Sequence, residues 1–153
     1  ALSNPYTGVA AIFAARLLNG KAPLVFEDGR QMRDFVSVND VVQANLLAME
    51  RPGADGMALN VGSGEPVSIR EVGATLMEAL ESGIFPELTG KYRAGDIRHC
   101  FADISAARKY LGYEPRVRFA DGIKELAGWL RLQQPQDRAA EAVAQLSNFG
   151  LTA

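Results

Sequence analysis

Cysteine and histidine are almost absent from this sequence, since its 153 residues include one of each. A single cysteine excludes a disulfide bond within the chain, and a single histidine argues against a histidine-based metal site. Both features fit the reducing cytoplasm, which is the location we expect. The sequence also lacks an apolar run long enough to span a membrane, and no signal peptide is visible.

Positive charge is not in surplus either, because 16 Lys and Arg residues stand against 18 Asp and Glu residues. The net charge of −2 gives no general cationic surface for nucleic acid or for an anionic membrane. We therefore expect neither as a partner. An anionic ligand would need a local cluster of basic residues.

Apolar residues, by contrast, make up 48% of the chain, which is enough to bury the core of one domain spanning residues 1–153. The sequence begins with Ala1 rather than Met, and an apolar helical pattern starts almost at once. We expect the chain to be a piece of a longer protein.

Helical and strand patterns alternate along the chain, which predicts an α/β fold. Asn39 or Asp40 is expected to cap the second helix, and Ser68 with Glu71 the third. Two strands flank a turn at 27–30 and could form a hairpin, and a nearly all-apolar third strand is typical of burial on both faces. The predicted helices are 9–18, 39–50, 68–83, 103–111, 120–130 and 135–146, and the strands are 23–26, 32–38 and 57–61.

Arg33 is the basic residue of the second predicted strand. A guanidinium with five donors suits a carboxylate or a phosphate better than it suits a core. Arg33 is therefore either a ligand clamp or the ion-pair partner of Asp34, Asp40 or another acid. The spacing alone favours the ion pair.

The segment from Arg93 to Asp103 is polar and irregular, and binding groups are often carried on such loops. Arg93 and Arg98 could clamp a diphosphate, while Asp96 could accept hydrogen bonds from sugar hydroxyls. A solvated cluster of salt bridges explains the same residues equally well.

Other patterns point less clearly to chemistry. Gly62-Ser63-Gly64 follows a predicted strand, but it lacks the third glycine and the lysine of the common phosphate motifs, which favours a structural turn. His99 and Cys100 are neighbours in sequence and so rarely face each other, which disfavours a catalytic pair. Trp129 and Phe119 are expected in the core.

Four motifs occur in order along the chain: Arg33-Asp34-Phe35-Val36 with Asp40, Asn60-Val61-Gly62-Ser63-Gly64, Arg93-Ala94-Gly95-Asp96-Ile97-Arg98 with Ala102-Asp103, and Leu111-Gly112-Tyr113. Together they resemble the motifs of the extended short-chain dehydrogenase/reductases, in the branch of NAD-dependent nucleotide-sugar epimerases and dehydratases such as UDP-galactose 4-epimerase. The resemblance extends to about Leu132 and concerns only the C-terminal part of that family. The Gly-x-x-Gly-x-x-Gly turn and the Tyr-x-x-x-Lys pair of those enzymes do not occur in this sequence.

The resemblance implies a small mixed α/β substrate-binding lobe, together with elements around 39–50 and Asn60 that would complete a missing Rossmann-type domain. It also implies binding roles for individual residues but no catalytic or metal-binding residue in this chain. Two arginines would grip the diphosphate, an acid would meet the ribose, and a strand would line the base. These residues are Arg33 and Arg93 for the diphosphate with Arg98 as a third contact, Asp96 for the ribose, Leu24 to Phe26 for the base, and Cys100 facing the hexose.

The expected function is therefore that of the nucleotide-diphosphate-sugar binding part of an NAD-dependent 4-epimerase, inactive alone and homo-oligomeric. The substrate would be UDP- or dTDP-linked, and NAD would be held by the missing domain. A 4,6-dehydratase or decarboxylase of the same family is the first alternative. A stand-alone nucleotide-sugar binding or interaction module is an alternative of another class.

Overall fold

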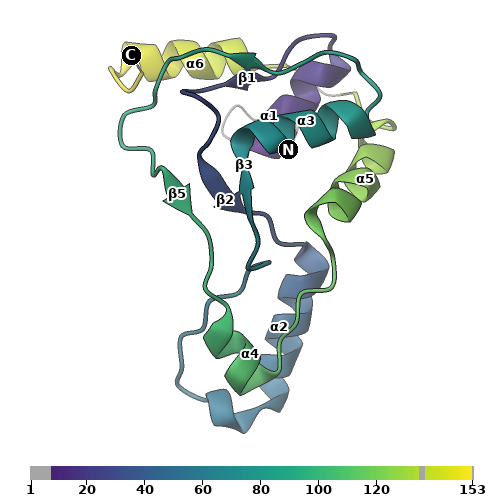
Figure 1. The fold of residues 1–153 in the computed structure, drawn as a ribbon, viewed down its shortest axis with the longest axis vertical. Coiled ribbons are helices and arrows are strands. Elements are labelled where there is room, and N and C mark those ends of the chain that lie inside the picture. The colour runs from purple at the N-terminus through teal and green to yellow at the C-terminus, as the bar shows by residue number, and fades with distance from the viewer. Residues whose placement is uncertain (1–7, 135–136, 153) are drawn as a thin grey trace. The chain divides into compact units, whose positions relative to one another are not determined.

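The structure is a computed structural model that describes residues 8–134 and 137–152 (Figure 1). Its described residues divide into two compact units. Unit 1 draws on the segments Ala1–Gln31, Ser68–Arg98 and Ile123–Ala153, and unit 2 on Met32–Val67 and His99–Gly122. The expectation of a single substrate-binding domain stays a prediction.

Unit 1 is built around two packed helices, α1 (Val9–Leu18) and α3 (Ile69–Ala79). Gly73 of α3 makes room for Pro86, because a Cβ at this position would lie only 2.8 Å from the Pro86 side chain, whereas its distance of 3.5 Å to Phe13 of α1 would be an ordinary contact. Ser68 begins α3 by accepting a hydrogen bond from the Glu71 amide, as predicted. Unit 1 also contains the parallel strands β1 (Leu24–Val25) and β4 (Glu87–Leu88) and the helix α6 (Ala139–Asn148).

Unit 2 combines a small sheet with two helices. The sheet has the order β3-β2-β5, and β2 runs parallel to β5. Helix α4 ends at Gly112, whose φ of 67° is the left-handed conformation that favours glycine at a helix end. The elements are β2 (Met32–Asp34), α2 (Val38–Glu50), a short 3-10 turn η1 (Pro52–Ala54), β3 (Pro66–Ser68, of which Ser68 falls in unit 1), β5 (His99–Cys100) and α4 (Ser105–Leu111).

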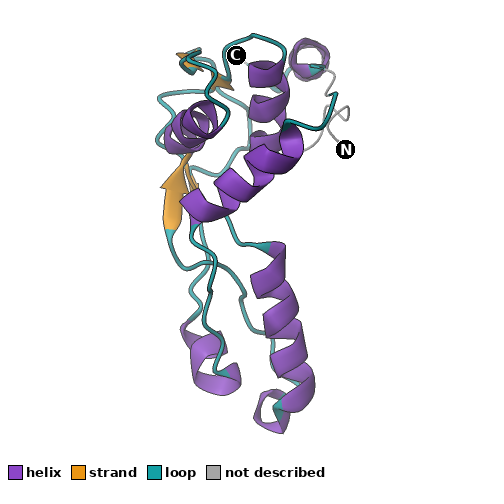
Figure 2. Cartoon of the chain, turned by 90° about the vertical axis from the view of Figure 1, so that its right-hand side faces the viewer, coloured by secondary structure: helices purple, strands orange, loops and turns teal. Residues whose placement is uncertain are grey.

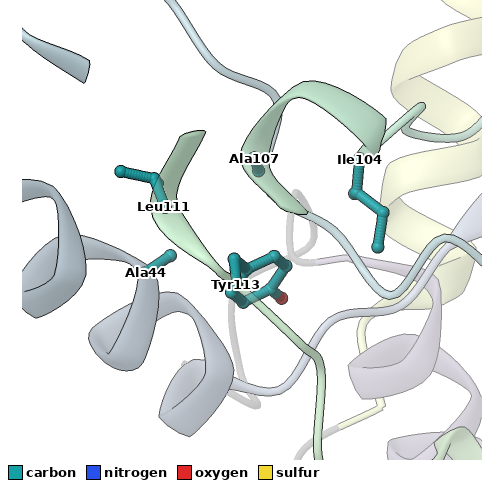
Figure 3. Packing of buried hydrophobic residues seen from close by; sticks show 5 residues of the cluster. All are labelled: Ala44, Ile104, Ala107, Leu111 and Tyr113. Carbon is teal, nitrogen blue, oxygen red and sulfur yellow. The ribbon is translucent and has the colours of Figure 1, made fainter. Parts of the chain in front are cut away.

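The core of unit 2 forms where α2 and α4 meet (Figure 3). The ring of Tyr113, just beyond α4, lies beside Ala44 of α2 and is completely buried. Partly buried residues from the 3-10 turn and from the segment after it pack around this centre. The cluster consists of Ala44, Ile104, Ala107, Leu111 and Tyr113.

Helices account for most of the regular structure, and the strands are two or three residues long (Figure 2). Helix α5 (Phe119–Leu130) starts among the residues of unit 2 and continues into those of unit 1. The α/β class predicted from the sequence is confirmed, since a mixed fold of helices and short strands is present.

Several local predictions were wrong. The strands at 24–25 and 32–34 do not form a hairpin, because β1 pairs with β4 and β2 pairs with β5. Residues 57–61 form no strand, and most of their side chains are exposed. The cap of α2 is Ser37 rather than Asn39 or Asp40, and Trp129 is 51% exposed rather than in the core.

Candidate functional site

The Asp34 carboxylate, at the end of β2, holds the Gly62-Ser63-Gly64 turn in place. It accepts hydrogen bonds from the Ser63 amide and hydroxyl, both at 2.7 Å, and from the Gly64 amide at 3.1 Å. The Ala102 amide, just beyond β5, donates to the same carboxylate at 3.3 Å. A Cβ at Gly62 would collide with Asp34 Oδ2 and lie 2.7 Å from the Ala102 Cβ. The turn therefore already holds an internal anion, which supports its interpretation as structural.

Asp40 and Tyr113 add a second polar connection within unit 2. The buried Asp40 carboxylate accepts hydrogen bonds from the Arg116 amide at 2.9 Å and the Val117 amide at 3.1 Å. The Tyr113 hydroxyl donates to the Gly62 carbonyl at 2.8 Å. Burial raises the pKa of Tyr113, and the nearby carboxylates of Asp40 and Asp34 raise it further.

Arg33 and Cys100, the two predicted site residues of unit 2, occupy paired positions. Cys100 of β5 lies opposite Arg33 of β2 in the parallel register. The Arg33 side chain is partly buried and donates to the Met32 carbonyl at 2.8 Å. The Cys100 side chain is exposed.

Arg93, Asp96 and Arg98, the remaining polar residues of the prediction, lie in an exposed segment of unit 1, residues 91–98. We call this segment the arginine loop. Its centre is a β-turn in which the Asp96 amide donates to the Arg93 carbonyl at 3.1 Å. The third residue of this turn, Gly95, has a φ of 77°, which favours glycine.

Both ends of the arginine loop are attached to the turn that follows β1. At the start, the Glu27 amide donates to the Lys91 carbonyl at 2.7 Å. At the end, Arg98 pairs with Glu27 at 2.6 Å and with Asp28 at 2.7 Å. The hydrogen bond from Arg98 is the main cause that holds the pKa of Asp28 well below its usual range. Within the described structure Arg98 thus acts as an ion-pair partner of acids, which is the alternative interpretation that the sequence left open for it.

Leu24 and Phe26 lie on and just after β1, at the start of the same turn. Gln31, which the sequence did not single out, is buried and donates to the Phe26 carbonyl at 3.1 Å, so that it closes this turn. A Cβ at Gly29 would lie 2.8 Å from Val25 and 3.0 Å from Arg70, so the turn has no room for a larger residue there. The predicted base-lining strand therefore leads into a well-fixed turn.

No group of three or more His, Cys, Asp and Glu side chains that could hold a metal ion occurs among residues 8–134 and 137–152. None of the helices in these ranges is long and apolar enough to cross a membrane.

Comparison with known proteins relates this geometry to one family. The sequence profile of the NAD dependent epimerase/dehydratase family matches residues 3–62. UDP-glucose 4-epimerase of Mycolicibacterium smegmatis is 38% identical over 124 residues, which is 81% of this chain and 39% of that protein. dTDP-L-rhamnose 4-epimerase of Burkholderia thailandensis is 34% identical over 129 residues, which is 84% of this chain and 35% of that protein.

The fold is also similar to that of solved structures. The crystal structure of a UDP-glucose 4-epimerase with UDP-glucose, from Thermotoga maritima, matches with a TM-score of 0.76 and 36% identity. The match covers 85% of this chain and 42% of that one. Further matches include a dehydratase, a decarboxylase and epimerase structures that contain NAD.

These matches confirm the resemblance predicted from the four motifs. The chain is related in sequence and fold to the NAD-dependent nucleotide-sugar epimerases and dehydratases of the extended short-chain dehydrogenase/reductase family. It spans about two-fifths of the length of the proteins that it matches.

Proposed function

We propose that this chain is the nucleotide-sugar binding part of an NAD-dependent nucleotide-sugar 4-epimerase and that it is inactive by itself. The observation that carries the proposal is the match in fold and sequence to a UDP-glucose 4-epimerase crystallised with UDP-glucose. The two curated relatives described above are also named as 4-epimerases of a UDP- or dTDP-linked sugar.

In this proposal Arg33 and Arg93 bind the diphosphate, because two negative phosphates in a cleft need hydrogen-bonded cations. Asp96 follows Arg93 in the same β-turn and accepts hydrogen bonds from the ribose. Leu24 and Phe26 line the base, Arg98 is the proposed third contact to the phosphates, and Cys100 faces the sugar.

NAD is the cofactor that we propose for the whole protein. The Gly62-Ser63-Gly64 turn does not fit its pyrophosphate, because the amides of Ser63 and Gly64 already bind the Asp34 carboxylate. We therefore assign NAD binding, and the oxidation and reduction of the sugar that NAD supplies, to a part of the protein outside this sequence.

A 4,6-dehydratase or decarboxylase is the second candidate, because proteins with those names are also among the relatives. A stand-alone binding module is the third. The reading frame upstream of the codon for Ala1 distinguishes the third candidate from the enzymes. A frame that encodes the glycine turn and the Tyr-x-x-x-Lys pair supports an enzyme, whereas a start codon at this point leaves only binding.

The protein encoded by the whole reading frame should then be incubated with NAD and, separately, with UDP-glucose, dTDP-glucose and UDP-glucuronic acid. Conversion to the 4-epimer supports the main proposal. Loss of water to give a 4-keto-6-deoxy sugar, or loss of carbon dioxide, supports the second candidate instead. The 153-residue chain alone should convert none of them.

A further inference from the structure

The arginine loop has a third attachment, to the last residues that the structure describes. Arg93 and Thr152 form an antiparallel bridge, and the Ala94 amide donates to the Leu151 carbonyl at 2.8 Å. All of these residues belong to unit 1. In Figure 1 the segment that leads from β4 to β5 accordingly runs beside α6 and the C-terminal end.

The segment 149–152, which we call the C-terminal segment, is itself held in a defined path. The Leu151 amide donates to the Leu146 carbonyl at 2.9 Å, and the Gly150 amide donates to that of Ser147 at 3.0 Å. Gly150 has a φ of 67°, so the chain reverses direction there in a conformation that favours glycine. The hydroxyls of Ser147 and Thr152 lie 2.9 Å apart.

Helix α6, which carries the C-terminal segment, is fastened to α1. The Asp137 carboxylate, two residues before α6, pairs with Lys21 at 2.9 Å and with Arg16 at 3.6 Å. Only 5% of the Asp137 side chain is exposed, so this pair is shielded from solvent on the acidic side. Contacts therefore connect α1 to α6, and the C-terminal segment that follows α6 to Arg93 and Ala94 of the arginine loop.

We propose that the C-terminal segment is a positioning element for Arg93, and that it sets the affinity of the protein for nucleoside diphosphates. This inference rests on the proposed function, in which Arg93 binds the diphosphate. When an exposed arginine on a loop binds a ligand, the backbone of the loop loses conformational freedom as well as the side chain. Fixing its backbone beforehand, by the β-turn on one side and the C-terminal segment on the other, removes a part of that cost.

The sharpest test is Ala94→Pro, because proline removes the amide hydrogen that Leu151 accepts. Ala94 is the second residue of its β-turn, a position that proline favours, so the turn itself should survive. Ala94→Ser keeps the amide and is the matched control. In the full-length protein, calorimetric titration with UDP and dTDP should show Kd raised about three- to tenfold by Ala94→Pro and unchanged by Ala94→Ser.

A second pair of variants approaches the same contact from the other side. Gly150→Val forces a β-branched residue into a left-handed conformation and should turn the C-terminal segment away from the arginine loop. Gly83→Val is the control, because Gly83 has a φ of 66° and, like Gly150, open space around its Cβ position. Gly150→Val should raise Kd, and KM with little change in kcat, whereas Gly83→Val should not.

Both substitutions should then be repeated with Arg93→Ala. If the C-terminal segment acts through Arg93, Ala94→Pro and Gly150→Val have no further effect on Kd in that background. An equal effect in both backgrounds, or no effect of Ala94→Pro where Arg93→Ala does weaken binding, overturns this inference but leaves the proposed function standing. An unchanged Kd for Arg93→Ala alone overturns the assignment of Arg93 and this inference with it.

Discussion

At the scale of single residues, the Asp34 carboxylate holds two distant segments of the backbone together. Asp34 follows Arg33 directly. Its two oxygens accept four hydrogen bonds from Ser63 and Gly64, which lie shortly before β3, and from Ala102, which lies just after β5. The sequence indicated an acid next to an arginine, which favoured an ion pair. The partners that the structure gives to Asp34 lie 29 to 68 residues away, and local spacing cannot predict contacts of that range.

Replacing Asp34 by Asn tests this role. The amide group would bring a donor to face amide donors, so we expect Asp34→Asn to lower the free energy of unfolding by about 1 to 3 kcal/mol. Asp55→Asn, at an exposed position, is the matched control and should change it by less than about 0.5 kcal/mol. Denaturant titration of both variants measures the difference. An Asp34→Asn variant as stable as its control would mean that the four hydrogen bonds contribute little.

Cys100 carries a prediction about the sugar. Its small, exposed side chain on β5 leaves room, so we expect the protein to accept a larger or rearranged sugar such as an N-acetylhexosamine or a deoxyhexose. Cys100→Tyr should fill that room and lower kcat/KM for an N-acetylhexosamine nucleotide by about tenfold or more, with a smaller loss for the hexose. Equal losses for the two sugars would show that this side chain does not line the site.

At the scale of elements, the predictions succeeded where the signal was local. Ser68 and Glu71 mark the start of α3, and Gly112 marks the end of α4, because capping depends on residues within one turn. The prediction of strand pairing failed. It paired β1 with the strand nearest in sequence, as a hairpin, but β1 pairs with a strand more than 60 residues away. The prediction that Asp40 could cap α2 was wrong, because its carboxylate instead accepts hydrogen bonds from the amides of residues 116 and 117.

The hydrogen bond from Tyr113 to Gly62 joins the end of α4 to the turn after residue 61. The burial of Tyr113 near the carboxylates of Asp40 and Asp34 should make the stability of the protein depend on pH. The pKa of Tyr113 is raised by folding, so the unfolded chain loses its proton first as the pH increases. The contribution of protonated Tyr113 to the free energy of unfolding is constant below the pKa of tyrosine in the unfolded chain, about 10. It is lost as the pH rises from there through the pKa of Tyr113 in the folded protein.

Tyr113→Phe should therefore cost about 1 kcal/mol of unfolding free energy at pH 7 and should make stability fall less between pH 9 and 11. Tyr110→Phe, one turn earlier and exposed, is the control. Denaturant titrations at several pH values provide the measurement. A parallel decline of stability with pH in the Tyr113→Phe variant and the unmodified protein would contradict this explanation.

At the scale of the whole molecule, α2 presents an apolar stripe that the described residues leave uncovered. Val38, Val42, Leu46 and Met49 are 72%, 51%, 54% and 84% exposed, and their spacing puts them on one face of the helix. The sequence predicted this helix as part of a larger domain. Which face it leaves uncovered is a matter of packing between distant segments, so it required the structure.

Such a stripe favours association, so we expect the 153-residue chain alone to form oligomers. Sedimentation velocity over a range of concentrations tests this expectation. Leu46→Glu combined with Met49→Glu should shift the chain toward the monomer, whereas Ala48→Glu, off the stripe but on the same helix, should not. A clean monomer of the unmodified chain at every concentration would contradict the expectation.

We propose that this chain recognises a nucleoside diphosphate through Arg33 and Arg93. Titration of UDP and dTDP into the full-length protein tests this proposal most directly. Each of Arg33→Ala and Arg93→Ala should weaken binding by about 1.5 to 3 kcal/mol, the scale of a charge-assisted hydrogen bond, with an unchanged thermal unfolding midpoint. Unchanged affinity in both variants would contradict the claim.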